Sequence, residues 1–287
     1  DSTGDWSSDV CSSDLYDLIT NQRSTIFKLN EHFEAPNWTK DGKYIIYNSE
    51  GLIWQYDIEN GEHKKIDTGD ITKCNNDHVL SADGLKIAVS SMDPGTYVDG
   101  GGGGYNSYIY IIPLSGGKPK KVTPLSPSFL HGWSTDGKIL AYCAMRDEKK
   151  GDIYTIPVEG GTETRLTNTE GLSDGPEYSA DGKHIWFNSV KSGLMQIWRM
   201  DNDGSNQKQI TNDERNNWFP HVSPDNKKVA YISYKKGDVQ RGDHPANKNV
   251  ELHIMNYDGS EKLTVVNLFG GQGTFNVNSR SEERRVG

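Results

Sequence analysis

The stretch EYSADGKHIWFNS (Glu177–Ser189) places a tight polar turn between two short runs of strand-forming residues. Its centre, Ala180–Lys183, contains an Asp-Gly pair, and this pair readily supplies the positive φ that a short hairpin loop requires. The run that follows is rich in β-branched and aromatic residues, which favour strands. The segment therefore predicts a β-hairpin. The same arrangement recurs in NWTKDGKYIIYNS, VLSADGLKIAVSS, GWSTDGKILAYCA and HVSPDNKKVAYIS.

These recurrences define a repeat. The turn aspartates are Asp41, Asp83, Asp136, Asp181 and Asp225, at intervals of 42, 53, 45 and 44 residues. Each unit continues into a second pair of strands around another turn, as in IYTIPVEGGTETRLT, and no segment shows a capped helical pattern of period 3.6. A lone four-stranded sheet cannot cover both of its faces, so such units pack radially as the blades of a β-propeller.

The number of units predicts an all-β, six-bladed β-propeller of four-stranded antiparallel blades. The chain opens on a hairpin at Tyr16–Leu29, continues through five complete units and reaches a last strand at Thr274–Ser279. We expect the N- and C-terminal pieces to share the closing blade, which protects the sheet edges. The sixth turn and the strand after it are missing, because NSRSEE stands where they are expected. We therefore expect this closing blade to be truncated.

Both ends of the chain differ in character from the repeat. DWSSDVCSSDL (Asp5–Leu15) and RSEERRVG (Arg280–Gly287) resemble translated sequencing adapters and show no strand alternation. We expect non-native segments at 1–15 and 280–287 around a single propeller domain at 16–279, so that the chain is a fragment.

Composition narrows the classes of partner. The chain has 287 residues and a formal charge of −9, without a basic cluster of the kind that binds nucleic acid. No apolar run is long enough to form a transmembrane segment. We expect a monomer that does not bind nucleic acid and has no transmembrane segment.

The repeat motifs resemble a known family. SADGKHIWF, SPDNKKVAYIS and STDGKILAYC, each followed by a strand pair of the type IYTIPVEGGTETRLT, are similar to the PD40 (WD40-like) repeats of TolB-type β-propellers. The same repeat occurs in the propellers of prolyl oligopeptidase relatives and, with variation, in oligogalacturonate lyases. The resemblance implies the fold and a periplasmic or extracellular location, whereas function depends on the site.

Topology places the candidate site at one mouth of the central channel. In each blade the turns between the first and second strands and between the third and fourth strands are short. The long loops between the second and third strands, at Asp93–Asn106 and Lys235–Asn249, lie on the other face, where function concentrates. Residues near the start of each innermost strand converge there. The candidate ligand-binding residues are His78, His131, Asp174, Glu177, Trp218 and His221. The alternative is that these histidines only hydrogen-bond neighbouring blades.

The sequence contains no complete catalytic motif. We therefore expect a non-catalytic scaffold, without a cofactor, that binds a protein, peptide or glycan through its loop face; Trp218 could stack on a sugar ring. The rival is a metal-assisted carbohydrate lyase or hydrolase, in which His78, His131 and His221 hold a divalent cation beside Glu177. A third interpretation is the propeller part of a prolyl oligopeptidase-type hydrolase.

Overall fold

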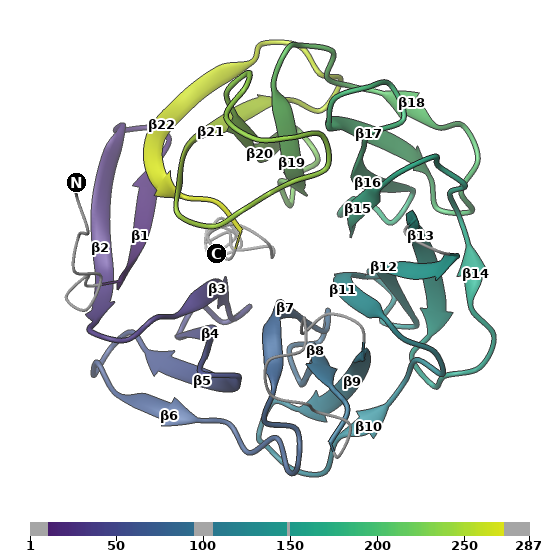
Figure 1. Ribbon diagram of the computed structural model, residues 1–287. Helices are drawn as coiled ribbons and strands as arrows, with labels where there is room; N and C mark the ends of the chain where they lie inside the picture. Colours follow the sequence, from purple (N-terminus) through teal and green to yellow (C-terminus); the bar gives the residue numbers. More distant parts are fainter. Residues whose placement is uncertain (1–10, 95–105, 148–149, 273–287) are drawn as a thin grey trace, which may run out of the picture.

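The blades are arranged as a ring around a central channel (Figure 1). The structure, a computed structural model, describes residues 11–94, 106–147 and 150–272. Five antiparallel sheets each contain four strands in sequential order, and a two-stranded sheet, β1–β2, lies between the last and the first of them (Figure 1). The innermost strands are β3, β7, β11, β15 and β19.

The strand bounds follow the repeat. The two-stranded sheet consists of β1 (Cys11–Asp17) and β2 (Gln22–Leu29). The first blade consists of β3 (Glu34–Trp38), β4 (Tyr44–Ser49), β5 (Leu52–Asp57) and β6 (His63–Lys65). The second consists of β7 (Cys74–Leu80), β8 (Lys86–Met92), β9 (Ser107–Pro113) and β10 (Lys120–Lys121). The third consists of β11 (Ser128–Trp133), β12 (Ile139–Asp147), β13 (Lys150–Pro157) and β14 (Thr164–Arg165). The fourth consists of β15 (Ser173–Tyr178), β16 (His184–Ser189), β17 (Gln196–Asp201) and β18 (Lys208–Gln209). The fifth consists of β19 (Asn216–Val222), β20 (Lys228–Tyr234), β21 (Lys248–Asn256) and β22 (Leu263–Gly270).

The prediction of six blades is wrong. The described residues form five four-stranded blades, and the position between β22 and β3 holds only the β1–β2 hairpin. The physical reason is that the complete turn-and-strand repeat occurs five times, so only five sheets have all four strands. The expected last strand, Thr274–Ser279, lies outside the described residues. The strand β1 begins at Cys11, so it includes Cys11–Leu15 of the segment set apart above.

The core lies between the blades. One cluster joins Ala88 and Ile109 of the second blade to Leu130 and Tyr142 of the third, and all four side chains are buried. Another joins Phe27 of β2 to the first blade. Each sheet thus covers its neighbour's apolar face, which is the reason for the radial arrangement. No helix in the described part of the chain is long and apolar enough to cross a membrane.

Candidate binding site at the channel mouth

Every innermost strand is irregular at the same place. The pairing register with the next strand shifts between Glu34 and Asn37, Cys74 and His78, Leu130 and Gly132, Asp174 and Glu177, and Trp218 and His221. Such bulges bend a strand and re-aim its side chains, and they occur preferentially next to functional sites. Five bulges at equivalent positions therefore direct side chains of successive blades toward the channel.

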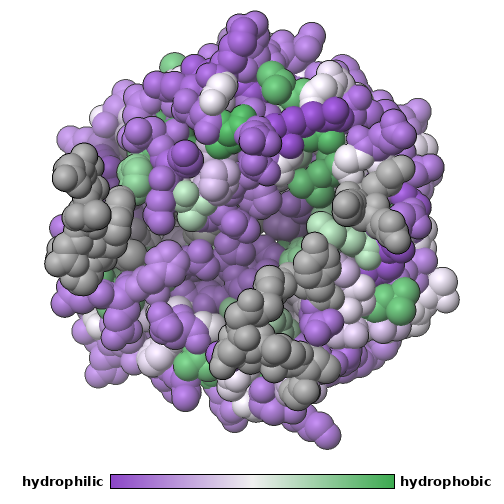
Figure 2. Space-filling model, viewed as in Figure 1, coloured by the Kyte–Doolittle hydropathy of each residue, from purple (hydrophilic) through white to green (hydrophobic). Residues whose placement is uncertain are grey.

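Three of these side chains meet near the axis. His131 on β11 lies between two carboxylates, with its Nε2 atom 3.1 Å from Asp174 Oδ1 on β15 and 4.0 Å from Asp77 Oδ1 on β7. All three residues are buried, with 4–7% of their surface exposed. In Figure 2 the centre of this face is a hollow lined mainly by hydrophilic residues.

The two carboxyl groups differ in acidity. Burial alone would raise the pKa of Asp174, but the adjacent His131 outweighs it and lowers that pKa to about 2. Burial raises the pKa of Asp77 to about 6, because His131 offsets only part of the desolvation and Asp174 adds repulsion. At neutral pH the mouth therefore carries a firmly ionised carboxylate beside one that gains a proton under mildly acidic conditions.

Phe219 and His244, which like Asp77 are not among the sequence candidates, complete the site. The Phe219 ring stacks on His131 at a centroid distance of 5.8 Å, and His244 contacts Phe219 edge-on at 5.5 Å. His244 comes from the long loop between β20 and β21, and the charge of Asp174 acts on it. Asp77, His131, Asp174, Phe219 and His244 are hereafter the mouth cluster.

Phe219 has an unusual backbone. Its φ is +54°, a left-handed conformation that a bulky residue rarely adopts, and its side chain is almost fully buried. The equivalent bulge positions are occupied by Ala35 at φ +53° and Gly175 at φ +60°. Strain of this kind costs about 1–3 kcal/mol and tends to persist at functional sites. The strained backbone of Phe219 therefore indicates that the channel mouth is a functional site.

Three other sequence candidates, Glu177, His221 and His78, are not part of the mouth cluster. Glu177 on β15 pairs with Nδ1 of His221 on β19 and accepts a hydrogen bond of 2.9 Å from the Val222 amide, so this pair joins the fourth and fifth blades. His78 is completely buried against backbone groups of Ile46 and Ala35 in the first blade. Burial lowers the pKa of His78 to about 4, which keeps it neutral at pH 7.

Trp218 is not open to a ligand. Its side chain is fully buried, and the His244 ring covers it at a centroid distance of 4.2 Å. Within residues 11–94, 106–147 and 150–272, no three His, Cys, Asp or Glu side chains are arranged to hold a metal ion. His78, His131 and His221 have different neighbours, so a divalent cation at this mouth stays a prediction.

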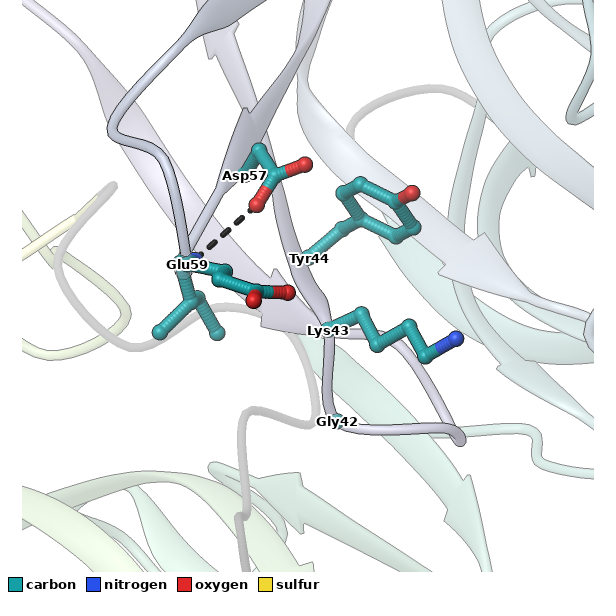
Figure 3. Close-up of a pocket in the computed structure, with 6 residues that line it drawn as sticks. Gly42, Lys43, Tyr44, Asp57 and Glu59 are labelled. Carbon is teal, nitrogen blue, oxygen red and sulfur yellow. Dashed lines mark hydrogen bonds between the residues drawn. The ribbon is translucent and has the colours of Figure 1, made fainter.

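A pocket of about 380 Å³ lies elsewhere, between two short turns of the first blade (Figure 3). It is lined by Gly42, Lys43, Tyr44, Asp57, Ile58 and Glu59. Asp57 Oδ1 accepts the Glu59 amide at 2.9 Å, so this carboxylate serves its own turn (Figure 3). None of the mouth cluster lines this pocket.

A ring of four-stranded blades with its polar cluster at one mouth defines a β-propeller of the WD40-like class. The TolB beta propeller domain family (PD40) matches residues 96–264, and the chain belongs to this family. It is 44% identical over 276 residues to the uncharacterized protein Atu1656 of Agrobacterium fabrum, which covers 96% of this chain and 90% of that protein.

Solved structures agree with this assignment. A TolB-like protein from Agrobacterium tumefaciens shares 44% identity, with a TM-score of 0.84 over 92% of this chain and 91% of its own. TolB from Acinetobacter baumannii has the same fold at 22% identity and a TM-score of 0.69. That match covers 91% of this chain but 60% of the longer TolB chain.

Proposed function

We propose that this propeller is a non-catalytic binding module that takes up an extended segment of a partner protein at the mouth cluster. The observation that carries the proposal is the meeting of His131, Asp174 and Asp77, from three different blades, at the hydrophilic hollow of this face. The buried Phe219 ring stacks on His131 and supports it. Five bulged strands supply a rigid frame for this cluster. A rigidly held group of ionisable side chains in a hollow is suited to binding a ligand, and we infer that binding is its function.

A peptide fits the mouth better than a glycan does. Sugar rings are bound by stacking on an open aromatic face, and His244 already covers Trp218. The ionised Asp174 offers a hydrogen-bond acceptor, which suits the N–H groups and basic side chains of an extended segment. The lyase alternative needs a metal-holding set, and the described residues contain none.

A displayed peptide library tests this proposal. We expect panning on the purified protein to enrich peptides whose affinity falls at least tenfold in Asp174→Asn, because the variant removes the ionised acceptor. The matched control is Asp136→Asn, an exposed aspartate in a hairpin turn on the opposite face, which should bind normally. Circular dichroism checks the fold of both variants. Equal binding by Asp174→Asn, or failure to enrich any peptide, would refute the proposal.

A further inference from the structure

The outer edges of the blades are not alike. In the first four blades the outermost strands, β6, β10, β14 and β18, have two or three residues, and each contains a lysine or an arginine. Short length and positive charge are the usual protection of an edge strand against pairing with another chain. These four edges are therefore protected in the ordinary way.

The outermost strand of the fifth blade has neither protection. β22 has eight residues, LTVVNLFG, and none of them is charged. β2, the other long outer strand, contains Arg23 and Lys28. In β22 the large apolar side chains Leu263 and Phe269 are 61% and 58% exposed. An exposed, long and apolar edge strand is a template for pairing.

The backbone of β22 is ready for such pairing. Among the residues that the structure describes, β22 is the last strand of its sheet and pairs with β21 alone. The ladder is regular from Val266 to Gly270, beyond an irregularity opposite Leu252 and His253. Every second residue of an edge strand points its N–H and C=O away from its partner, so this regular part presents unpaired groups to the outside of the ring.

We propose that β22 pairs antiparallel with β22 of a second copy of this chain. In a twofold pair each residue faces a residue of the same strand, so a basic edge would bring like charges together, whereas β22 brings none. A twofold axis at Leu268 would place that residue opposite its copy and the two Phe269 rings on a diagonal within mutual reach. Two copies of the uncharged, apolar β22 strand are thus complementary in an antiparallel pair.

The expected dimer is weak and symmetric. One strand pair buries less surface than the 1,200–2,000 Å² or so of a standard interface, so the dissociation constant should be on the order of micromolar or weaker. At protein concentrations below this dissociation constant the chain would be the monomer that the sequence analysis expects. This surface is on the outside of the ring, so the inference does not depend on the mouth cluster.

Sedimentation velocity from about 1 µM to 1 mM tests the dimer. We expect the wild type to shift from monomer to dimer, and Phe269→Lys to weaken the association at least tenfold, because each copy then places a cation in the pair. The matched control is Leu85→Lys, at a leucine that is 68% exposed in a hairpin turn of the second blade, which should associate like the wild type.

Hydrogen exchange locates the contact. Amides in residues 263–270 should exchange more slowly at high protein concentration than at low concentration, while those of β6, β10, β14 and β18 should not change. A protein that stays monomeric to 1 mM, including one whose β22 instead takes a strand from another protein, would overturn the proposal. So would a dimer in which β22 exchange is unchanged, or one that Leu85→Lys weakens as much as Phe269→Lys.

Discussion

The residues that repeat most strictly stabilise the hairpin turn in which they lie. In each blade a Ser or Thr two positions before the turn aspartate donates its hydroxyl to that aspartate, as Ser179 does to Asp181 Oδ1 at 2.6 Å. The same hydroxyl accepts the amide of His184 at 3.0 Å, and Gly182 supplies a φ of +68°. The residues around this Ser or Thr and the aspartate differ from blade to blade. The sequence signal therefore marks the turn and not the function.

The mouth cluster gives a residue-scale prediction about pH. The folded-state pKa of Asp77, about 6, lies above its ordinary value of 3.8 because of burial. A raised carboxyl pKa stabilises the fold at low pH, and this contribution is lost as the pH rises from about 4 to 6. Urea unfolding should therefore show a loss on the order of 2 kcal/mol over this range, and Asp77→Asn should abolish it.

The control for this titration is Asp70→Asn, at an exposed aspartate in the loop that leads into β7. It should keep the wild-type dependence of the unfolding free energy on pH. If Asp77→Asn also kept that dependence, another group would be responsible and the assignment to Asp77 would be wrong.

Sequence reasoning found part of the site. His131 and Asp174 could be located because their distance from a turn aspartate fixes where they lie on the innermost strand. Phe219 was missed because an apolar residue in a strand normally indicates core, and only its positive φ distinguishes it. His244 was missed because nothing in the sequence of a long loop says where the loop folds back.

At the scale of elements, the bulge of the innermost strand is the feature on which the site depends. Gly175 occupies it in the fourth blade with φ +60°, and a Cβ there would lie 2.6 Å from Asn188 Oδ1 and 3.1 Å from the Phe219 ring. Asn188 Oδ1 accepts the Phe219 amide at 3.0 Å. The absence of a side chain at Gly175 therefore keeps the bulge of the next blade in place.

We expect Gly175→Ala to reduce the free energy of unfolding by about 2–4 kcal/mol, from backbone strain together with the clash. The matched control is Gly137→Ala, where φ is +75° but no atom lies within 4 Å of the added Cβ. This control should lose only about 1 kcal/mol. Urea unfolding of both variants measures the difference, and equal losses would show that the clash contributes nothing.

The strands themselves were predictable, whereas the closure was not. Asp-Gly turns and alternating apolar residues fix each hairpin by local chemistry, and all five complete units form four-stranded blades. The sixth position depends on the meeting of segments far apart in the chain, and no local pattern specifies it. The hairpin at the N-terminal end was expected from its own turn, and it is what the structure places there.

At the scale of the molecule, the ring is stabilised by contacts between successive innermost strands, from β3 through β7, β11 and β15 to β19. Central blades therefore have a neighbour on both sides. The β1–β2 sheet packs on the first blade through Phe27, the one buried side chain of β2 in the core cluster that they share, whose ring lies 4.5 Å from that of Tyr56 and 5.4 Å from that of Tyr47. The aromatic contacts of a single residue, Phe27, thus help to hold the smallest sheet on the first blade.

We expect Phe27→Ala to release this sheet selectively. Hydrogen exchange should then accelerate at least tenfold in β1 and β2, while the amides of β11, β15 and β16 keep their protection because their packing is intact. Ile19→Ala, at a 76% exposed residue in the same hairpin, should change neither group. If Phe27→Ala instead reduced protection equally in every blade, the two-stranded sheet would be essential to the closed ring, and the five blades would not be stable without it.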